Sequence, residues 1–146
     1  MKNILIGVLS IFISLAIHSQ NKEQDNILYK YIKAHNIGTD SSLKDFIKKV
    51  YHPEVYAKIN LKDHVAFYNQ IVEEFGALNF IIYKKIEETP SKLVAYLIKK
   101  EDRINNKFIQ PQNILVVEIE LSKKNPKYID KSLGLGSLLC EQKKKE

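Results

Sequence analysis

Four side chains could line a binding pocket: His64, Tyr68, Tyr83 and Tyr96. His64 precedes the apolar face of a predicted helix by one position and stands beside Asp63, so its imidazole could serve as a general base. The tyrosines would add hydroxyl groups at the mouth of a cavity. Each residue also has a structural explanation, because a single histidine at a helix edge or an aromatic residue on a strand usually belongs to a core or an interface. These four are therefore pocket candidates without a catalytic assignment.

The other reactive residues do not form a catalytic or metal-binding pattern. His35, His52 and His64 have no i, i+4 partner and no cysteine near them, so no metal site is expected. His35 would end a helix, where a cationic imidazole suits the helix dipole. No serine or cysteine has a base close by in the sequence, so nucleophilic catalysis has no candidate. In the adjacent pairs Glu73-Glu74 and Glu87-Glu88 the two side chains point apart, which suits exposure to solvent better than acid–base catalysis. We expect no catalytic residue, no metal and no cofactor.

The charge balance gives little support to nucleic-acid binding. Lysine and arginine number 23 against 17 acidic residues, and the formal net charge is +6. Arg103 is the sole arginine, whereas nucleic-acid sites favour clustered arginine with stacking aromatics. The lysines are expected to form solvated faces, with weak contact to an anionic membrane or wall polymer as a further option. The single cysteine, Cys140, leaves no intramolecular disulfide to form.

The N-terminus is typical of a targeting segment. Lys2 precedes an apolar run from Ile4 to Ile17, and polar residues resume at His18. The run suits the core of a signal peptide and is short for a membrane span of ~20 residues. We expect residues 1–20 to be removed, so that the mature chain has no membrane span and is periplasmic or secreted. The alternative is a retained N-terminal anchor.

The remainder divides into a linker over residues 21–25, one domain over 26–137 and a basic tail over 138–146. A helix is predicted from the apolar face of Ile27, Leu28, Tyr31, Ile32 and His35, with Gly38 closing it. A second helix should begin at Ser41 or Ser42, where Ser42 and Asp45 could form a capping box. Its buried face should be Leu43, Phe46, Ile47, Val50 and Tyr51. It should end before Pro53, with a connector over residues 54–60.

A third helix is predicted over residues 61–75, with an apolar face of Leu61, Val65, Tyr68, Ile71, Val72 and Phe75. Asn60 and Asp63 suit a capping box at its start. Gly76 directly follows the last periodic residue, where a left-handed cap costs glycine nothing.

The second half of the chain predicts an antiparallel meander of four strands. The strands are expected from Leu78 to about Glu88, Lys92 to about Ile104, Asn113 to Ser122 and Tyr128 to Leu133. Thr89-Pro90-Ser91 suits the first turn. Gly134-Leu135-Gly136 lacks the third glycine of a dinucleotide loop and is interpreted as the end of the fold. Three helices followed by this meander give an α+β class, with the helices gathered on one face.

This order of elements resembles the nuclear transport factor two-like superfamily. The segments AHNIGTD, FIKKVYHPEV, EEFGALNF and EETPSKLVAYL carry the likeness, in particular to the cone-shaped domain beside secreted bacterial serine hydrolases of the β-lactamase-related group. The resemblance implies a curved sheet wrapped on helices, often with a pocket and often dimeric. It does not imply hydrolysis here, because no S-x-x-K or G-x-S-x-G motif follows.

Three functions are consistent with these observations. The first is an exported, non-catalytic binding or accessory domain, whose partner is an envelope protein or a small molecule. The second is a small isomerase or hydratase that uses His64 and a tyrosine. The third is a structural dimer that scaffolds another envelope protein.

A homodimer is expected through the outer face of the sheet, because the second strand is apolar on both faces. Leu93, Ala95 and Leu97 alternate with Val94, Tyr96 and Ile98. Such a patch left toward water would favour burial against a second copy. The alternative is that the hairpin over residues 107–112 folds over the patch within one chain.

Overall fold

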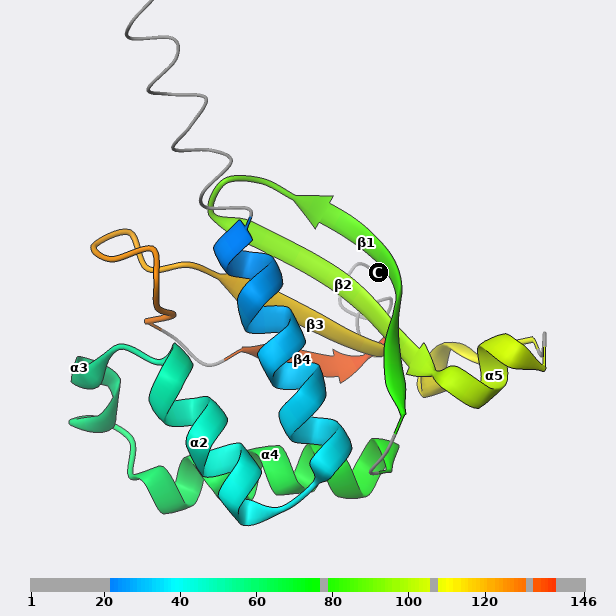
Figure 1. Ribbon diagram of the computed structural model, residues 1–146, viewed down its shortest axis with the longest axis horizontal. Coiled ribbons are helices and arrows are strands. Elements are labelled where there is room, and N and C mark those ends of the chain that lie inside the picture. The colour runs from blue at the N-terminus through cyan, green and yellow to red at the C-terminus, as the bar shows by residue number, and fades with distance from the viewer. Residues whose placement is uncertain (1–21, 77–78, 106–107, 131–132, 139–146) are drawn as a thin grey trace, which may run out of the picture.

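A layer of helices covers one face of a four-stranded antiparallel sheet (Figure 1). The computed structural model describes residues 22–76, 79–105, 108–130 and 133–138. The strands follow one another in the order β1-β2-β3-β4, so that β1 and β4 are the edge strands. The predicted α+β class, with helices followed by an antiparallel meander, is confirmed.

The N-terminal helix occupies residues 22–37. It buries the predicted face, with Ile27, Leu28 and Tyr31 fully enclosed. Gly38 ends it at φ 65°, and the Gly38 amide donates to the Ala34 carbonyl at 3.0 Å. Residues 22–25, which we expected as a polar linker, are helical. Gln24 is buried there and donates to the Thr89 carbonyl at 3.0 Å.

Helix α2 (Asp40–Val50) begins earlier than predicted. Thr39, rather than Ser41 or Ser42, is the N-cap: its side chain accepts from the Ser42 amide, and the Ser42 hydroxyl oxygen accepts from the Thr39 amide, both at 3.3 Å. The capping box therefore joins Thr39 to Ser42 instead of Ser42 to Asp45. The buried face of Leu43, Phe46, Ile47 and Val50 is as predicted.

The predicted connector after α2 contains a short helix, α3 (Pro53–Tyr56). Proline suits the first helical position because the amide that it lacks would have no partner in the helix. The His52 side chain caps this helix by accepting from the Glu54 amide at 3.3 Å. Pro53 thus separates two helices instead of leading into a loop.

Helix α4 (Leu61–Phe75) has the predicted bounds. Asn60 caps it by accepting from the Lys62 amide at 2.9 Å. Gly76 has the predicted positive φ of 83°, but its ψ of 148° is extended rather than left-handed helical. The chain therefore leaves α4 directly in an extended direction toward β1.

The strands are β1 (Phe80–Glu88), β2 (Lys92–Lys99), β3 (Leu115–Glu120) and β4 (Gly134–Ser137). Register shifts interrupt β1 twice, at Ile82/Lys84 and at Lys85/Glu87. Such bulges increase the twist of an edge strand and disturb its free hydrogen-bonding groups. Leu78, at the predicted start of the first strand, lies outside the described residues.

Strand β2 ends five residues before its predicted end at Ile104, and helix α5 (Lys100–Ile104) follows it. The four charged residues at positions 100–103 offer no alternation of apolar and polar side chains, so nothing extends the strand. A short 3-10 helix, η1 (Pro111–Asn113), precedes β3.

The fourth strand was predicted in the wrong place. Ile129 forms an isolated parallel bridge with Tyr51, and the strand itself is Gly134–Ser137. A Cβ atom at Gly134 would lie 3.0 Å from the Cβ of Glu118, so a residue without a side chain suits this close approach. The glycines that we interpreted as the end of the fold are therefore part of the sheet.

The inner face of the sheet supplies the core, with Leu93, Ala95 and Leu97 of β2 beside Leu115, Val117 and Ile119 of β3. On the outer face, Val94 and Tyr96 are half-buried, but Ile98 is completely buried. Val116, which pairs with Tyr96, is also buried. The expectation that the whole outer face of β2 is open to water is therefore wrong at Ile98.

Candidate functional site

The four pocket candidates do not converge on one cavity. His64 and Tyr68 of α4 are buried, with 4% and 1% of their surface exposed. Tyr83 of β1 is 52% exposed. Tyr96 of β2 alternates with the core residues Ala95 and Leu97, so it lies on the face of the sheet opposite the helices. Helix α4 brings together only the first two.

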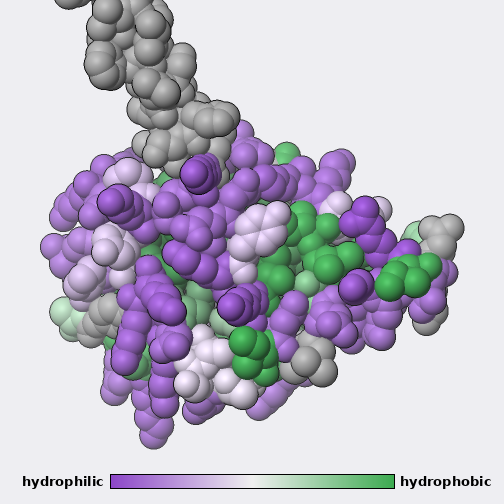
Figure 2. Space-filling model, viewed as in Figure 1, coloured by the Kyte–Doolittle hydropathy of each residue, from purple (hydrophilic) through white to green (hydrophobic). Residues whose placement is uncertain are grey.

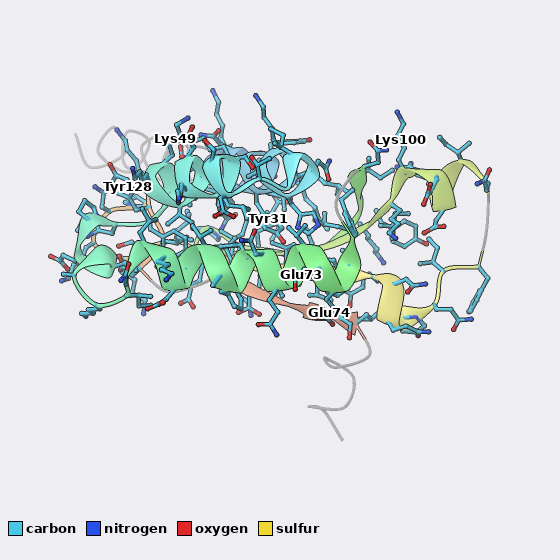
Figure 3. The ribbon with its side chains drawn as sticks, turned by 90° about the horizontal axis from the view of Figure 1, so that it is seen from below. Tyr31, Lys49, Glu73, Glu74, Lys100 and Tyr128 are labelled. Carbon is cyan, nitrogen blue, oxygen red and sulfur yellow. The ribbon has the colours of Figure 1, made fainter. Side chains whose placement is uncertain are left out.

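His64 and Tyr68 instead belong to a buried tyrosine–histidine cluster, which we define as Tyr31, His35, Tyr51, His64 and Tyr68. Tyr31 points from the N-terminal helix into the space beside α4 (Figure 3). Its ring centroid lies 5.9 Å from that of Tyr68, and the Tyr51 centroid lies 5.0 Å from that of His64. The cluster thus joins three helical segments in the interior.

Both ring nitrogens of His35 have a hydrogen-bond partner. Its Nε2 lies 3.1 Å from the Gly76 carbonyl oxygen, and its Nδ1 lies 3.3 Å from the Tyr31 hydroxyl. Because a carbonyl can only accept, Nε2 carries the proton and Nδ1 accepts from Tyr31. Burial lowers the pKa of His35, and the bond to Gly76 opposes this only in part. The cationic, dipole-stabilising imidazole that we expected is therefore a neutral, buried one.

Tyr51 and Tyr68 pair through their hydroxyl groups at 2.6 Å. The Tyr51 oxygen also accepts from the Leu133 amide at 3.1 Å. Burial raises the pKa of Tyr51, although its hydrogen bonds to Tyr68 and Leu133 act in the opposite direction. Burial likewise raises the pKa of Tyr68 and of Tyr31 far above the ordinary value. All three phenols are consequently protonated at neutral pH.

His64 differs from His35 because both of its ring nitrogens are buried and neither has a hydrogen-bond partner among the described residues. Burial lowers its pKa, which neighbouring Asp63 opposes only in part. A neutral imidazole can accept a proton, but His64 is packed against the Tyr51 ring and is closed to solvent. In this conformation only 4% of its surface is exposed, so it offers little of its ring to a substrate.

Sequence reasoning missed Asn36 and the polar roles of Tyr31 and Tyr51. Asn36 donates to the Phe80 carbonyl at 3.1 Å and accepts from the Phe80 amide at 2.9 Å, so it binds the start of β1 as a neighbouring strand would. The apolar periodicity found both tyrosines as buried residues. It gave no indication that the Tyr51 hydroxyl would bond to Leu133, which is 82 positions away, or that the Tyr31 hydroxyl would bond to His35, which is 4 positions away.

The surface offers a groove between the N-terminal helix and α2. Lys30, Lys33, Asp45 and Lys49 line it together with Ser42, and Ala34, Ile37 and Phe46 supply its apolar part. Figure 2 shows the face that carries these helices, with hydrophobic surface gathered over β1 beside them. Half of the residues that line this groove are charged, so it suits contact with a surface more than enclosure of a substrate.

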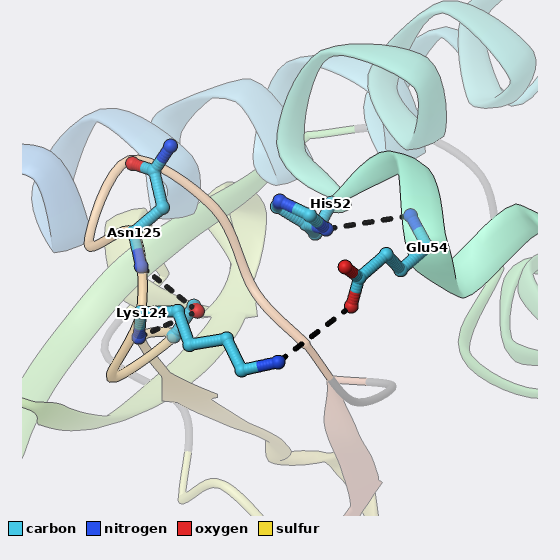
Figure 4. Close-up of polar contacts among 5 residues, drawn as sticks. His52, Glu54, Lys124 and Asn125 are labelled. Carbon is cyan, nitrogen blue, oxygen red and sulfur yellow. Dashed lines mark hydrogen bonds and ion pairs between the residues drawn. The ribbon is translucent and has the colours of Figure 1, made fainter.

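A second polar site joins α3 to the loop after β3 (Figure 4). Lys124 Nζ lies 3.9 Å from Glu54 Oε2, and the Ser122 hydroxyl oxygen accepts from the Lys124 and Asn125 amides at 3.2 Å. The ion pair is exposed and contributes little. These contacts fix a loop and leave no group positioned for chemistry.

Within the part of the chain that the structure describes, no three histidine, cysteine or acidic side chains are grouped so that they could hold a metal ion. Over the same residues, no helix combines the length and the apolar composition needed to cross a bilayer.

Comparison of the chain with models of protein families, with curated proteins and with solved structures finds no match. The resemblance to the nuclear transport factor two-like superfamily therefore rests on the short segments and on the order of elements.

Proposed function

We propose that this protein is an exported, non-catalytic binding or accessory domain that recognises its partner on its surface. The observation that carries this proposal is the burial of His64 and Tyr68, the two candidates that share a helix. Groups that act on a substrate must reach it. Here the Tyr68 hydroxyl is already paired with Tyr51 and the imidazole of His64 faces the interior.

Membership of the nuclear transport factor two-like superfamily is part of the same proposal. A layer of helices on one face of a four-stranded antiparallel meander supports it. Export is supported by the apolar run from Ile4 to Ile17, which lies outside the described residues.

The pocket enzyme has weaker support. An isomerase or hydratase would need a base and an acid whose pKa values lie near the working pH. Burial moves the pKa of His64 down and that of Tyr68 up, so the two groups resist the proton transfers that this mechanism requires.

Export is tested by intact-mass measurement of the protein recovered from the cell envelope. The expected chain begins at Gln20 or Asn21. Recovery of the full-length chain from the cytoplasm would contradict this part of the proposal.

Surface recognition is tested by cross-linking in cells with three proteins: the wild type, His64→Phe and the double variant Tyr83→Lys/Ile86→Lys. Tyr83 and Ile86 are exposed hydrophobic residues of β1. We expect His64→Phe to keep the cross-linked species and the surface variant to lose them. The reverse pattern in two folded variants would favour an interior site.

A homodimer through the outer sheet face is a second arrangement, which would serve as a scaffold for another envelope protein. The half-buried Val94 and Tyr96 on adjacent positions of that face support it. Tyr96→Lys should yield a folded monomer by light scattering, whereas Ile98→Lys should unfold because Ile98 is completely buried. A wild type that is monomeric at high concentration would contradict the dimer.

A further inference from the structure

Five lysines share the outward side of the N-terminal helix and α2: Lys30, Lys33, Lys44, Lys48 and Lys49. None of their ammonium groups forms an ion pair with the residues that the structure describes. Two carboxylates lie among them, Asp45 at the groove and Asp40, which accepts from Asn69 at 2.8 Å. We call this surface the basic face. Its lysines exceed its acids by three.

The charge is segregated on the helix layer. Lys49 lies on the outward side of α2, whereas Glu73 and Glu74 lie on α4 at a different side of the molecule (Figure 3). Both glutamates are exposed. An anionic surface would therefore be attracted to one side of the helix layer and repelled from another, which fixes an orientation.

Apolar side chains stand beside these lysines. Tyr29 and Ile37 are 61% and 52% exposed, and they flank Lys33 at intervals of four residues on one side of the N-terminal helix. The hydrophobic surface over β1 appears on the same face of the molecule (Figure 2). Lysines next to exposed aromatic and aliphatic side chains are the combination found on surfaces that rest in the headgroup region of a bilayer.

We infer that the basic face docks on the surface of an anionic phospholipid bilayer, with Tyr29 and Ile37 entering the headgroup region. Lysine suits this role because a diffuse layer of anionic headgroups attracts positive charge and does not require the bidentate hydrogen-bond geometry of arginine. A soluble polyanion would be attracted by the same lysines but would leave Tyr29 and Ile37 without a partner. The inference rests on the proposed function, because it adds a lipid-docking surface to a non-catalytic binding domain, separate from the β1 surface that the cross-linking test examines.

The test is flotation with vesicles of phosphatidylglycerol and phosphatidylcholine, compared with vesicles of phosphatidylcholine alone. The protein is used as recovered from cells, and its first residue is identified by intact-mass measurement. The quantity measured is the preference for phosphatidylglycerol, which is the ratio of binding to the two vesicle types. An uncharged apolar segment binds both types equally and therefore creates no preference. We expect a clear preference that weakens as salt is raised.

Two variants with the same change in net charge locate the surface. Lys30→Glu/Lys33→Glu/Lys49→Glu reverses the basic face and should lower the preference about tenfold or more. Lys84→Glu/Lys123→Glu/Lys127→Glu reverses three exposed lysines elsewhere and should retain most of it. If the first variant does not fold, the glutamine replacements at the same three positions provide the comparison.

A third variant, Tyr29→Ser/Ile37→Ser, separates a bilayer from a soluble polyanion. It should weaken vesicle binding and leave binding of soluble polyphosphate unchanged. Unchanged vesicle binding would overturn the lipid assignment. A wild type without preference for phosphatidylglycerol, or equal losses in the two charge variants, would overturn the docking face. Either failure leaves the proposed function standing, because its own test compares His64→Phe with the β1 surface variant in cells.

Discussion

His35 and His64 form a matched pair that tests the closed interior. Both are buried, at 1% and 4% exposure, and burial lowers the pKa of each. They differ in their hydrogen bonds, because His35 has a partner at both ring nitrogens whereas His64 has none among the described residues. Replacement of each by phenylalanine should therefore change stability in opposite directions.

The expected magnitudes follow from the partners left behind. His35→Phe leaves the Tyr31 hydroxyl and the Gly76 carbonyl without their bonds, which should cost about 2–4 kcal/mol. His64→Phe removes two buried polar atoms that have no hydrogen-bond partner among the described residues, so it should raise the free energy of unfolding by about 1 kcal/mol. His64→Leu guards against a loss caused by overpacking of the larger ring.

The pH dependence provides an independent readout. The pKa of each native histidine lies below the unfolded value of about 6.5, so the unfolded chain binds more protons in acid. Stability is complete above this pH and falls as the pH drops toward the native pKa, by at most about 1.4 kcal/mol per unit for each histidine. His64→Phe should remove one of these two contributions.

Urea denaturation at a series of pH values from 8 to about 5 measures both effects. We expect His35→Phe to be less stable than the wild type at every pH, and His64→Phe to be more stable with a shallower acid slope. A His64→Phe variant that loses stability as His35→Phe does, together with an equal loss in His64→Leu, would refute the reasoning.

Three further substitutions test the packing by the same denaturation assay. Ile71→Ala truncates a buried residue of α4 and should cost roughly 2–5 kcal/mol, whereas exposed Glu73→Ala should stay within about 0.5 kcal/mol; equal midpoints would mean that the helix face is wrong. Asn36→Ala removes both bonds to the start of β1 and should cost about 1–3 kcal/mol, and an unchanged midpoint would contradict this role. Gly76→Ala forces a side chain onto a φ of 83° and should cost about 1 kcal/mol or more, while Gly136→Ala meets nothing within 4 Å and is the control; a larger loss at Gly136 would contradict the argument.

The helices were predictable because the apolar residues of each one recur at helical spacing. Leu61–Phe75 has the predicted bounds, since its apolar stripe begins after Asn60 and stops at Gly76. The predicted start of α2 was wrong because four consecutive residues, Thr39 to Ser42, are all of types that can cap a helix. The choice of Thr39 is accompanied by the bond from the Ser42 hydroxyl to the Ala34 carbonyl at 3.0 Å, a tertiary contact that the local sequence does not contain.

The fourth strand was not predictable from propensity. Tyr128 to Leu133 has stronger strand character than Gly134-Leu135-Gly136, yet the glycines pair with β3. Ile129 instead bonds to the end of α2, donating to the Val50 carbonyl at 2.9 Å and accepting from the His52 amide at 3.1 Å. The close approach of Gly134 to Glu118 and the long-range bonds of Ile129 therefore determine which segment forms the fourth strand.

The candidate site was predicted by residue type alone, and this explains its failure to converge. Periodicity placed Tyr68 inside, but His64 stood one position from the apolar face and its burial depends on contact with Tyr51 from another helical segment. The alternation of β2 could have assigned Tyr96 to the side opposite the helices. For Tyr83, the bulge between Ile82 and Lys84 breaks the alternation from which a face would be assigned.

The most direct test of the central claim, that recognition occurs on the surface and not in an interior pocket, is an NMR titration of the His64 imidazole. The closed interior predicts that this resonance titrates below the ordinary pKa of about 6.5, because burial lowers the pKa of His64. A titration of His64 near its ordinary pKa, in a protein that stays folded, would show that water reaches the ring and would contradict the account.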